Sequence, residues 1–284
     1  MGLFGKGKDE TSELERQPTF GPYRLHELIN SGGMADLWLA TNQQEETFAL
    51  RLMHQNLRFD LVAKRRFQRG CEILSKIHTH SQVIGYYGHG KLEGRLYLVM
   101  EYVEGANMRE LLHQNDPMLV DKVWTLLMDM AYALEQVHDS GFMHLDYKPE
   151  NLLVSRNGQL RLVDFDLALP KPDVPIKLWK YGGTPAYMAP EQLLHQRIDH
   201  RADLFAFGVA AYELLTRQRP FPGETAEEIL RKQLDRASNF VSPREYNPDL
   251  SVPMEKVILK CLERDPDKRY PHMSVLIRDL QAAP

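Results

Sequence analysis

The hydrophobic pattern of this chain changes character once, near Gly105, from the alternation of strands to the period of helices. Before that point, runs between Tyr23 and Met53 alternate apolar and polar residues, as half-buried strands do. After it, apolar residues between Val123 and Val137 follow the 3.6-residue helical period. We therefore expect an α+β fold, with a β-rich lobe of about 80 residues followed by a helical lobe of about 180.

The first lobe is expected to contain five strands and one helix. The third strand, Thr47–Met53, would place Ala49 and Arg51 on one face and Leu50 and Leu52 on the other. The helix, Asp60–Ile77, would contain a glycine, Gly70, which weakens a helix by ~1 kcal/mol relative to alanine. The other strands are expected near Tyr23–Glu27, Leu37–Ala40, Val83–Ile84 and Leu96–Tyr102.

Helices of the second lobe are recognised by their caps and their apolar periods. One would end just before Gly141, and another would begin at Thr225, which stands three residues before Glu228 as in a capping box. A nearly all-apolar run containing Asp203 predicts a buried helix. The runs concerned are Val123–Val137, Ala202–Leu215, Met254–Leu262 and Ser274–Leu280.

Composition excludes several classes of function. The chain has 35 basic and 39 acidic residues, a net charge of −4, so no general attraction to nucleic acid or to membranes is indicated. Its two cysteines, Cys71 and Cys261, form no metal-type spacing, and so few cysteines favour a reducing compartment. No apolar run approaches the ~18 residues that span a bilayer, and the start lacks a signal-peptide core. We expect a cytoplasmic protein with a disordered tail over residues 1–19.

Four short motifs follow one another in the second lobe. They are His144-Leu-Asp-Tyr-Lys-Pro-Glu-Asn151, Asp164-Phe-Asp166, Gly183-Thr-Pro185 and Ala189-Pro-Glu191. In this order and spacing the chain resembles the protein kinase family, in particular bacterial serine/threonine kinases of the eukaryotic type. The resemblance covers roughly residues 20–281. It implies a bilobal protein-kinase fold, with a small five-stranded antiparallel sheet lobe (about residues 20–103) and a larger helical lobe (about residues 104–281).

The resemblance also implies ATP and Mg²⁺ as ligands and a protein as substrate or partner. Asp146 would orient the attacking hydroxyl, and Lys148 would steady the transferred phosphate. Asn151 and Asp164 would hold magnesium. Thr184 would bond Asp146, which completes the set of residues expected around the reacting groups.

Nucleotide-binding and scaffold residues are carried over in the same way. Backbone groups of Glu101 and Val103 would meet the adenine, and Gly32 belongs to the glycine-rich turn over the phosphates. The remaining assignments are the apolar residues around the base, Leu37, Ala49 and Leu153; the loop anchor Asp203; and the pair Glu191–Arg269.

Several positions that handle phosphate depart from the family pattern. Arg51 stands where the family has a lysine, and Gly70 stands where the helix should supply its partner glutamate, so the usual ion pair is absent. Glu72 is roughly 200° around the helix from that position and would need a rearranged helix to substitute. The last glycine of the Asp-Phe-Gly motif is Asp166.

The glycine-rich turn is altered as well. It has Asn30 and Ala35 in place of two glycines. Asp36 would disfavour phosphate if its side chain pointed inward, whereas an outward side chain would be harmless.

Two functions are compatible with these residues. One is an ATP-binding serine/threonine protein kinase-like phosphotransferase with atypical or weak activity, which the retained Asp146, Lys148, Asn151 and Asp164 favour. The alternative is a pseudokinase that acts as a nucleotide-responsive binding or scaffold module, which the altered phosphate-handling positions favour.

Overall fold

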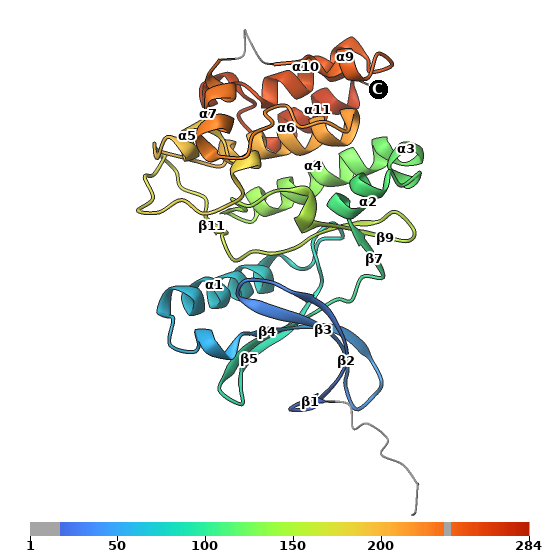
Figure 1. Cartoon of the computed structure of the whole chain (residues 1–284), viewed down its shortest axis with the longest axis vertical. Coiled ribbons are helices and arrows are strands. Elements are labelled where there is room, and N and C mark those ends of the chain that lie inside the picture. The colour runs from blue at the N-terminus through green and yellow to red at the C-terminus, as the bar shows by residue number, and fades with distance from the viewer. Residues whose placement is uncertain (1–17, 236–239, 284) are drawn as a thin grey trace, which may run out of the picture.

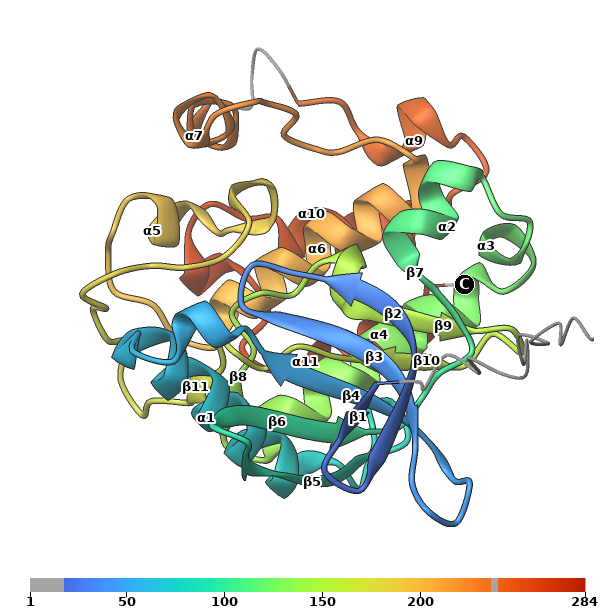
Figure 2. The same ribbon diagram turned by 60° about the horizontal axis from the view of Figure 1, so that its bottom comes forward.

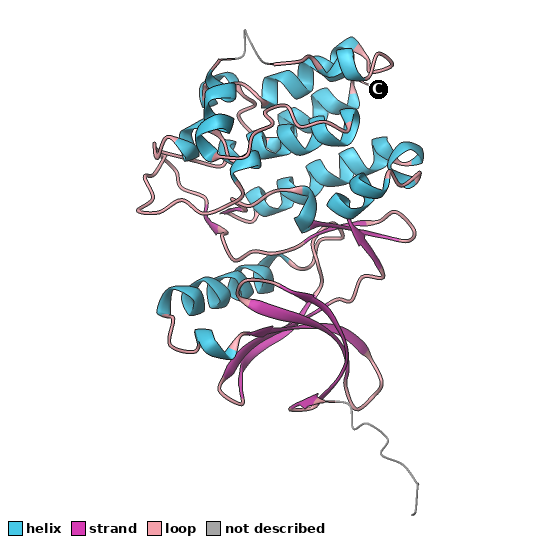
Figure 3. Cartoon of the chain, viewed as in Figure 1, coloured by secondary structure: helices cyan, strands magenta, loops and turns pink. Residues whose placement is uncertain are grey.

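A curled antiparallel sheet and a group of helices form the two lobes of the computed structural model, which describes residues 18–235 and 240–283 (Figures 1 and 3). The sheet has the strand order β1-β2-β3-β4-β6-β5. Its strands are β1 (Thr19–Phe20), β2 (Tyr23–Ser31), β3 (Ala35–Thr41), β4 (Thr47–Met53), β5 (Tyr86–Leu92) and β6 (Arg95–Met100).

The expected sheet lobe is present, but two details of its strands were wrong. The sheet has six strands rather than five, because Thr19 and Phe20 pair with Arg24 and Tyr23 as a short edge strand. Thr19 therefore lies in the sheet, while residues 1–17 of the expected tail fall outside the described residues. The predicted domain bounds stay a prediction.

The second correction concerns Val83 and Ile84, which were expected to form a strand of the sheet. Val83 instead makes an isolated bridge to Leu162 of the second lobe, and the Ile84 amide donates to the Leu162 carbonyl at 3.1 Å. The edge strand is the following β5, whose two central glycines and polar residues mask its extended conformation in the sequence.

The two faces of the sheet belong to two separate cores. Leu50 and Leu52 of β4 pack with Phe20 and Val99 in a small cluster on one face. Ala49 faces the other way, into a core that continues through the helix of this lobe and across to the helical lobe. This alternation agrees with the expected faces of β4, and it directs Ala49 and Arg51 toward the second lobe.

The helix of the first lobe is α1 (Leu61–Ile77), which lies along the sheet on the side of the second lobe (Figure 1). The Asp60 carboxylate caps it by accepting from the amides of Val62 and Ala63, both at 2.9 Å. Gly70 falls in the middle of the buried stripe of this helix.

The second lobe is built around α6 (Arg201–Thr216), in which all residues but the first and Leu215 are buried. It packs against α4 (Val123–Asp139) and α10 (Val252–Cys261) (Figure 2). Gly141 follows α4 with φ +84°, a conformation that favours glycine beyond a helix end. The other helices are α2 (Met108–Gln114), α3 (Met118–Asp121), α5 (Pro190–Leu193), α7 (Ala226–Leu234), α9 (Pro243–Tyr246) and α11 (Met273–Gln281).

Short strands at the junction of the lobes carry the loops with the sequence motifs. The loop of residues 144–151 runs from β8 (Phe142–Met143) to β9 (Leu152–Ser155), and the loop of residues 163–168 runs from β10 (Leu160–Leu162) to β11 (Leu169–Pro170). β10, β9 and β7 (Gly105–Asn107) form one small sheet, and β11 pairs with β8. Each loop runs between these two small sheets, because β9 pairs with β10 and β8 pairs with β11. The two loops therefore lie side by side.

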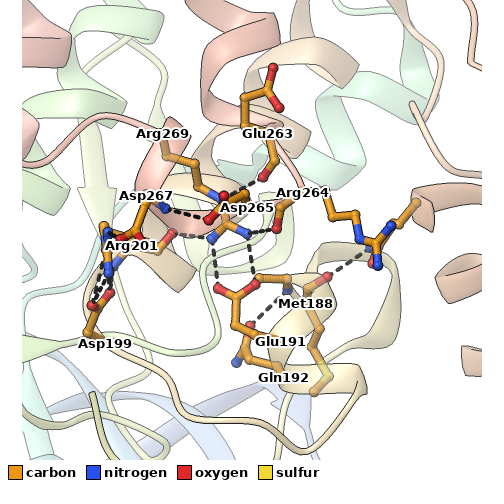
Figure 4. A network of polar contacts seen from close by, with 12 residues as sticks. Met188, Glu191, Gln192, Asp199, Arg201, Glu263, Arg264, Asp265, Asp267 and Arg269 are labelled. Atoms are coloured by element: carbon orange, nitrogen blue, oxygen red, sulfur yellow. Dashed lines mark hydrogen bonds and ion pairs between the residues drawn. The ribbon is translucent and has the colours of Figure 1, made fainter.

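A buried ion pair fixes the end of the segment that follows these loops. Both oxygens of Glu191 accept from the Arg269 guanidinium at 2.7 Å, and the side chains are 6% and 0% exposed (Figure 4). Arg269 also donates to the carbonyls of Arg201, Glu263 and Arg264, so every guanidinium nitrogen has a partner. This pair was expected from the sequence, and it joins the start of α5 to the chain before α11.

Removing one member of this pair should cost much more than removing a surface charge. Arg269→Met leaves the Glu191 carboxylate buried without its partner, and we expect the free energy of unfolding to fall by about 3–5 kcal/mol. Urea unfolding followed by circular dichroism measures the change. Arg156→Met is the matched control, because Arg156 and Glu104 are 75% and 61% exposed, and a loss under about 1 kcal/mol is expected there. Equal losses in the two variants would contradict this assignment.

Candidate active site

Asp203, a buried carboxylate on α6, holds the backbone of the loop of residues 144–151. Its Oδ2 accepts from the His144 amide at 2.8 Å and from His138 Nε2 at 2.9 Å, while its Oδ1 accepts from the Leu145 amide at 2.8 Å. Leu145 has φ +62°, a left-handed conformation that is costly for a residue with a branched side chain. The two backbone bonds from Asp203 hold that conformation.

Burial by itself would raise the pKa of the Asp203 carboxyl, but the hydrogen bond and charge of His138 and the loop amide of Leu145 outweigh it and lower the pKa below its ordinary value. The Asp203 carboxylate is therefore ionised at neutral pH and acts as a fixed acceptor for the loop.

Three polar side chains gather on this loop. Lys148 Nζ lies 2.8 Å from Asp146 Oδ2, and Asn151 Nδ2 donates to the carbonyl and to the carboxylate of Asp146 at 2.8 and 3.2 Å. Thr184 was expected to bond Asp146, but its hydroxyl accepts from Lys148 Nζ at 2.9 Å instead. The lysine reaches both partners because its ammonium has three donors, so it stands between Thr184 and Asp146.

The neighbouring loop places Asp164 beside this group. The Val163 amide donates to the Asn151 carbonyl at 2.9 Å, and His144 Nε2 lies 3.1 Å from the Val163 carbonyl. The ring of Phe165 meets that of His144 edge to face at 5.1 Å. These contacts bring Asn151 and Asp164 to the wall of one cleft.

That cleft, between the two lobes, has a volume of about 570 Å³, which is within the usual range for a small-molecule site. Its wall contains every residue expected to bind nucleotide, as well as the two expected metal ligands. These residues are Gly32, Leu37, Ala49, Arg51, Glu101, Val103, Asn151, Leu153 and Asp164.

The linker between the lobes offers free backbone groups to this cleft. Neither the amide nor the carbonyl of Val103 bonds any described residue, although unpaired backbone groups are rare away from water. The Glu101 side chain is occupied elsewhere, because its Oε2 accepts from Arg161 Nε at 3.0 Å and from the Gly85 amide at 3.1 Å. The backbone groups of Val103 are thus available at this edge of the cleft.

The most unexpected contact in the cleft is made by Arg51. Its two terminal nitrogens donate to both oxygens of Asp166, at 2.9 and 2.6 Å, and Nη1 also lies 3.7 Å from Asp164 Oδ1. Burial would lower the pKa of Arg51, but the carboxylates of Asp164 and Asp166 raise it. Glu72 is exposed and forms no ion pair with any residue that the structure describes, so it does not substitute for the missing glutamate there. Sequence reasoning saw the loss of the usual pair and missed its replacement.

The glycine-rich turn keeps its acidic residue away from the cleft. Asp36 accepts from the Ser31 hydroxyl at 2.7 Å and from His54 Nε2 at 2.9 Å, and it lies 3.8 Å from Arg95. Of the two alternatives for Asp36, the outward one holds.

Sequence reasoning also missed Arg109, on α2. Its guanidinium donates to Glu150 of the loop of residues 144–151 at 3.0 Å and to Glu213 of α6 at 2.7 Å, and it bonds the Tyr187 hydroxyl. This cation neutralises two carboxylates beside the loop of residues 144–151. No local pattern signals it, because its partners lie 41 to 104 residues away in the chain.

A cleft between two lobes, with these two facing loops, is the architecture of a protein kinase. A sequence model described as "Protein kinase domain" matches residues 23–279. The chain belongs to the protein kinase family, and it is similar to serine/threonine kinases of bacteria.

Curated relatives support this placement. The chain is 32% identical over 279 residues to the serine/threonine-protein kinase PknE of Mycobacterium tuberculosis, which covers 97% of this chain and 48% of that protein. It is 29% identical over 265 residues to PrkC of Bacillus subtilis, with 93% and 40% covered. It is 29% identical over 265 residues to the probable serine/threonine-protein kinase PknB of Lactococcus lactis. That match covers 91% of this chain and 41% of the relative. The chain thus spans less than half the length of these relatives.

Among the described residues, no helix has the length and apolar character to cross a membrane. The cytoplasmic location stays a prediction.

The anchoring role of Asp203 predicts a pH-dependent cost of its removal. Because the folded-state pKa is lowered, the ionised carboxylate stabilises the fold above the unfolded-state pKa of about 3.9, and this stabilisation disappears as the pH falls below that value. We expect Asp203→Asn to lower the free energy of unfolding at pH 7 by about 2 kcal/mol, and the difference from the unaltered chain to shrink below about pH 4. Urea unfolding between pH 3 and 8 measures it, and a difference that stays constant with pH would contradict the assignment.

Proposed function

We propose that this chain is an atypical serine/threonine protein kinase, which transfers the γ-phosphoryl group of ATP to a hydroxyl of a protein substrate. The observation that carries the proposal is the grouping of Lys148 and Asn151 around Asp146, with Lys148 Nζ 2.8 Å and Asn151 Nδ2 3.2 Å from Asp146 Oδ2. This loop lies next to a cleft that is also lined by Asp164.

The cleft suits a nucleotide at its apolar end. Leu37 and Ala49 from the first lobe and Leu153 from the second line opposite walls, and a planar base fits between such surfaces. The unpaired amide and carbonyl of Val103 supply one donor and one acceptor at the edge of the base. These groups would fix the orientation of adenine, while the phosphates extend toward the two facing loops.

The polar end of the cleft suits magnesium. Asn151 uses its side-chain N–H groups on Asp146, which leaves its amide oxygen without a donor among the described residues. The Asp164 side chain is 38% exposed. Two hard oxygen donors are what Mg²⁺ takes from protein when phosphates and water complete its shell. When bound, the ion would neutralise charge on the phosphates.

Asp146 is proposed to take the proton of the attacking hydroxyl. Asn151 donates to its Oδ2 and to its carbonyl, which holds the carboxylate in one orientation. Lys148 lies beside the same oxygen, and its remaining donor can stabilise negative charge on the transferred group. Thr184 steadies Lys148, so each residue in the set is positioned by another.

A nucleotide-responsive binding module without transfer is the second candidate. It is favoured by the two-pronged contact of Arg51 with Asp166, which leaves less of the guanidinium for phosphate, and by Asn30 and Ala35 in the glycine-rich turn. Both functions need the same Mg-ATP site. They differ in whether the γ-phosphate is transferred to a protein.

Asp146→Asn should separate chemistry from binding. We expect it to lower phosphate transfer to casein, and to the chain itself, by about 10²-fold or more, since a general base contributes about that much. Mg-ATP should still raise the thermal unfolding midpoint, because the cleft keeps its ligands. Radiolabelled phosphate incorporation and a thermal melt are the two measurements.

Asp173→Asn is the control, because Asp173 is an exposed carboxylate of the following segment, and transfer should stay unchanged. Stabilisation by Mg-ATP without transfer in the unaltered chain would favour the binding module. No response to Mg-ATP at all would contradict both functions.

A further inference from the structure

Three residues that depart from the family pattern meet at one point in the cleft. Arg51 comes from β4, Gly70 from the middle of α1, and Asp166 from the loop after Asp164. The two charged side chains are largely removed from water, at 18% exposed for Arg51 and 9% for Asp166. They are far apart in the sequence, so nothing but the fold brings them together.

Gly70 provides the space in which Asp166 lies. A Cβ atom at position 70 would stand 2.9 Å from Asp166 Oδ1, 3.0 Å from the Phe165 carbonyl carbon and 3.1 Å from the Asp166 amide nitrogen. Two of these three neighbours are backbone atoms, which cannot rotate away. A glycine weakens the interior of a helix, so helix stability does not explain it. The close approach of the loop of residues 163–168 explains the glycine.

The contact between Arg51 and Asp166 has the geometry that distinguishes arginine from lysine. Two parallel bonds join the guanidinium to both carboxylate oxygens, at 2.9 and 2.6 Å. A lysine ammonium is a point charge and cannot make such a two-pronged contact. The guanidinium also lies 5.2 Å from the centre of the Phe67 ring, which covers one of its faces.

In protein kinases the cation of this strand is held by a glutamate of the helix. Here the helix has no side chain at that place, and the Asp166 carboxylate of the facing loop contacts the cation instead. Asp166 is itself held to the helix, because Arg69 Nη2 of α1 donates to its carbonyl at 3.1 Å. The three departures therefore compensate one another in charge and in volume.

We infer that Asp166 is a positioning residue, which replaces the helix glutamate as the partner that orients Arg51 toward the nucleotide phosphates, and that Gly70 is the space this replacement requires. The inference rests on the proposed function. The orientation of Arg51 is then determined by the loop that carries Asp164 and Asp166. It is no longer determined by a charged side chain of α1.

The same contact could have the opposite, inhibitory role, which we call a latch. If Asp166 held Arg51 away from the phosphates, breaking the pair would release the cation and increase both nucleotide affinity and transfer. A positioning residue gives the reverse sign. Asp166→Asn keeps the shape of the side chain and removes its charge, so it distinguishes the two directly.

The test compares Asp166→Asn, Arg51→Lys, Gly70→Glu and the triple variant Arg51→Lys/Gly70→Glu/Asp166→Gly, which rebuilds the family arrangement. We expect Asp166→Asn to weaken Mg-ATP binding, measured by calorimetry, and to lower kcat for casein phosphorylation by about 10-fold or more, with the KM for casein unchanged. Gly70→Glu should be impaired most, because its side chain meets Asp166. The triple variant should recover to within about 3-fold of the unaltered chain.

A second measurement does not depend on nucleotide or on transfer. Arg51→Met, Asp166→Asn and the double variant are unfolded in urea without ATP, and the double variant should lose less than the sum of the two single losses. Asp173→Asn again serves as the charge-matched control. This cycle and the calorimetry decide the inference even if the unaltered chain transfers no phosphate, a result that would contradict only the proposed function.

Two results would overturn the inference. One is a gain in Mg-ATP affinity or in transfer on Asp166→Asn, which identifies a latch. The other is additive loss of stability in the cycle together with an Asp166→Asn variant that binds Mg-ATP as the unaltered chain does. A triple variant that recovers while each single variant is impaired supports the inference.

Discussion

The geometry of the site depends on one buried carboxylate. Asp203 sits on the most buried helix of the second lobe and accepts from two consecutive loop amides, so the loop inherits the rigidity of the core. The left-handed Leu145 marks where that constraint acts on the backbone. Asp146, Lys148 and Asn151 follow directly, and the fixed backbone before them helps to hold their side chains within bonding distance.

The two lobes contribute to the cleft in different ways. Residues of the second lobe are held by partners in the same lobe, as Asn151 holds Asp146 and Thr184 holds Lys148. Arg51 of the first lobe is held across the cleft by Asp166. The ion pair is therefore both part of the site and a connection between the lobes, and it stands within 3.7 Å of Asp164.

Features that depend on neighbouring residues could be predicted from the sequence, whereas contacts between distant residues could not. Helices such as α4 and α6 were predictable because the apolar period of α4 and the apolar run of α6 can be recognised in the local sequence. The edge strand β5 was not, since glycine and polar residues hide its pairing with β6. The residues of the site were named from motif spacing, whereas the partners of Arg51 and Thr184 depend on contacts across 115 and 36 residues. No spacing rule contains that information.

The close approach at Gly70 also limits the order in which these positions can vary. While an aspartate occupies position 166, a side chain at position 70 meets backbone atoms of the opposite loop, so the helix residue must become small before the aspartate can enter. In the reverse direction, the aspartate must be lost before a side chain can return at position 70. Substitutions at positions 51, 70 and 166 are therefore interdependent, because both sterics and charge link these three positions.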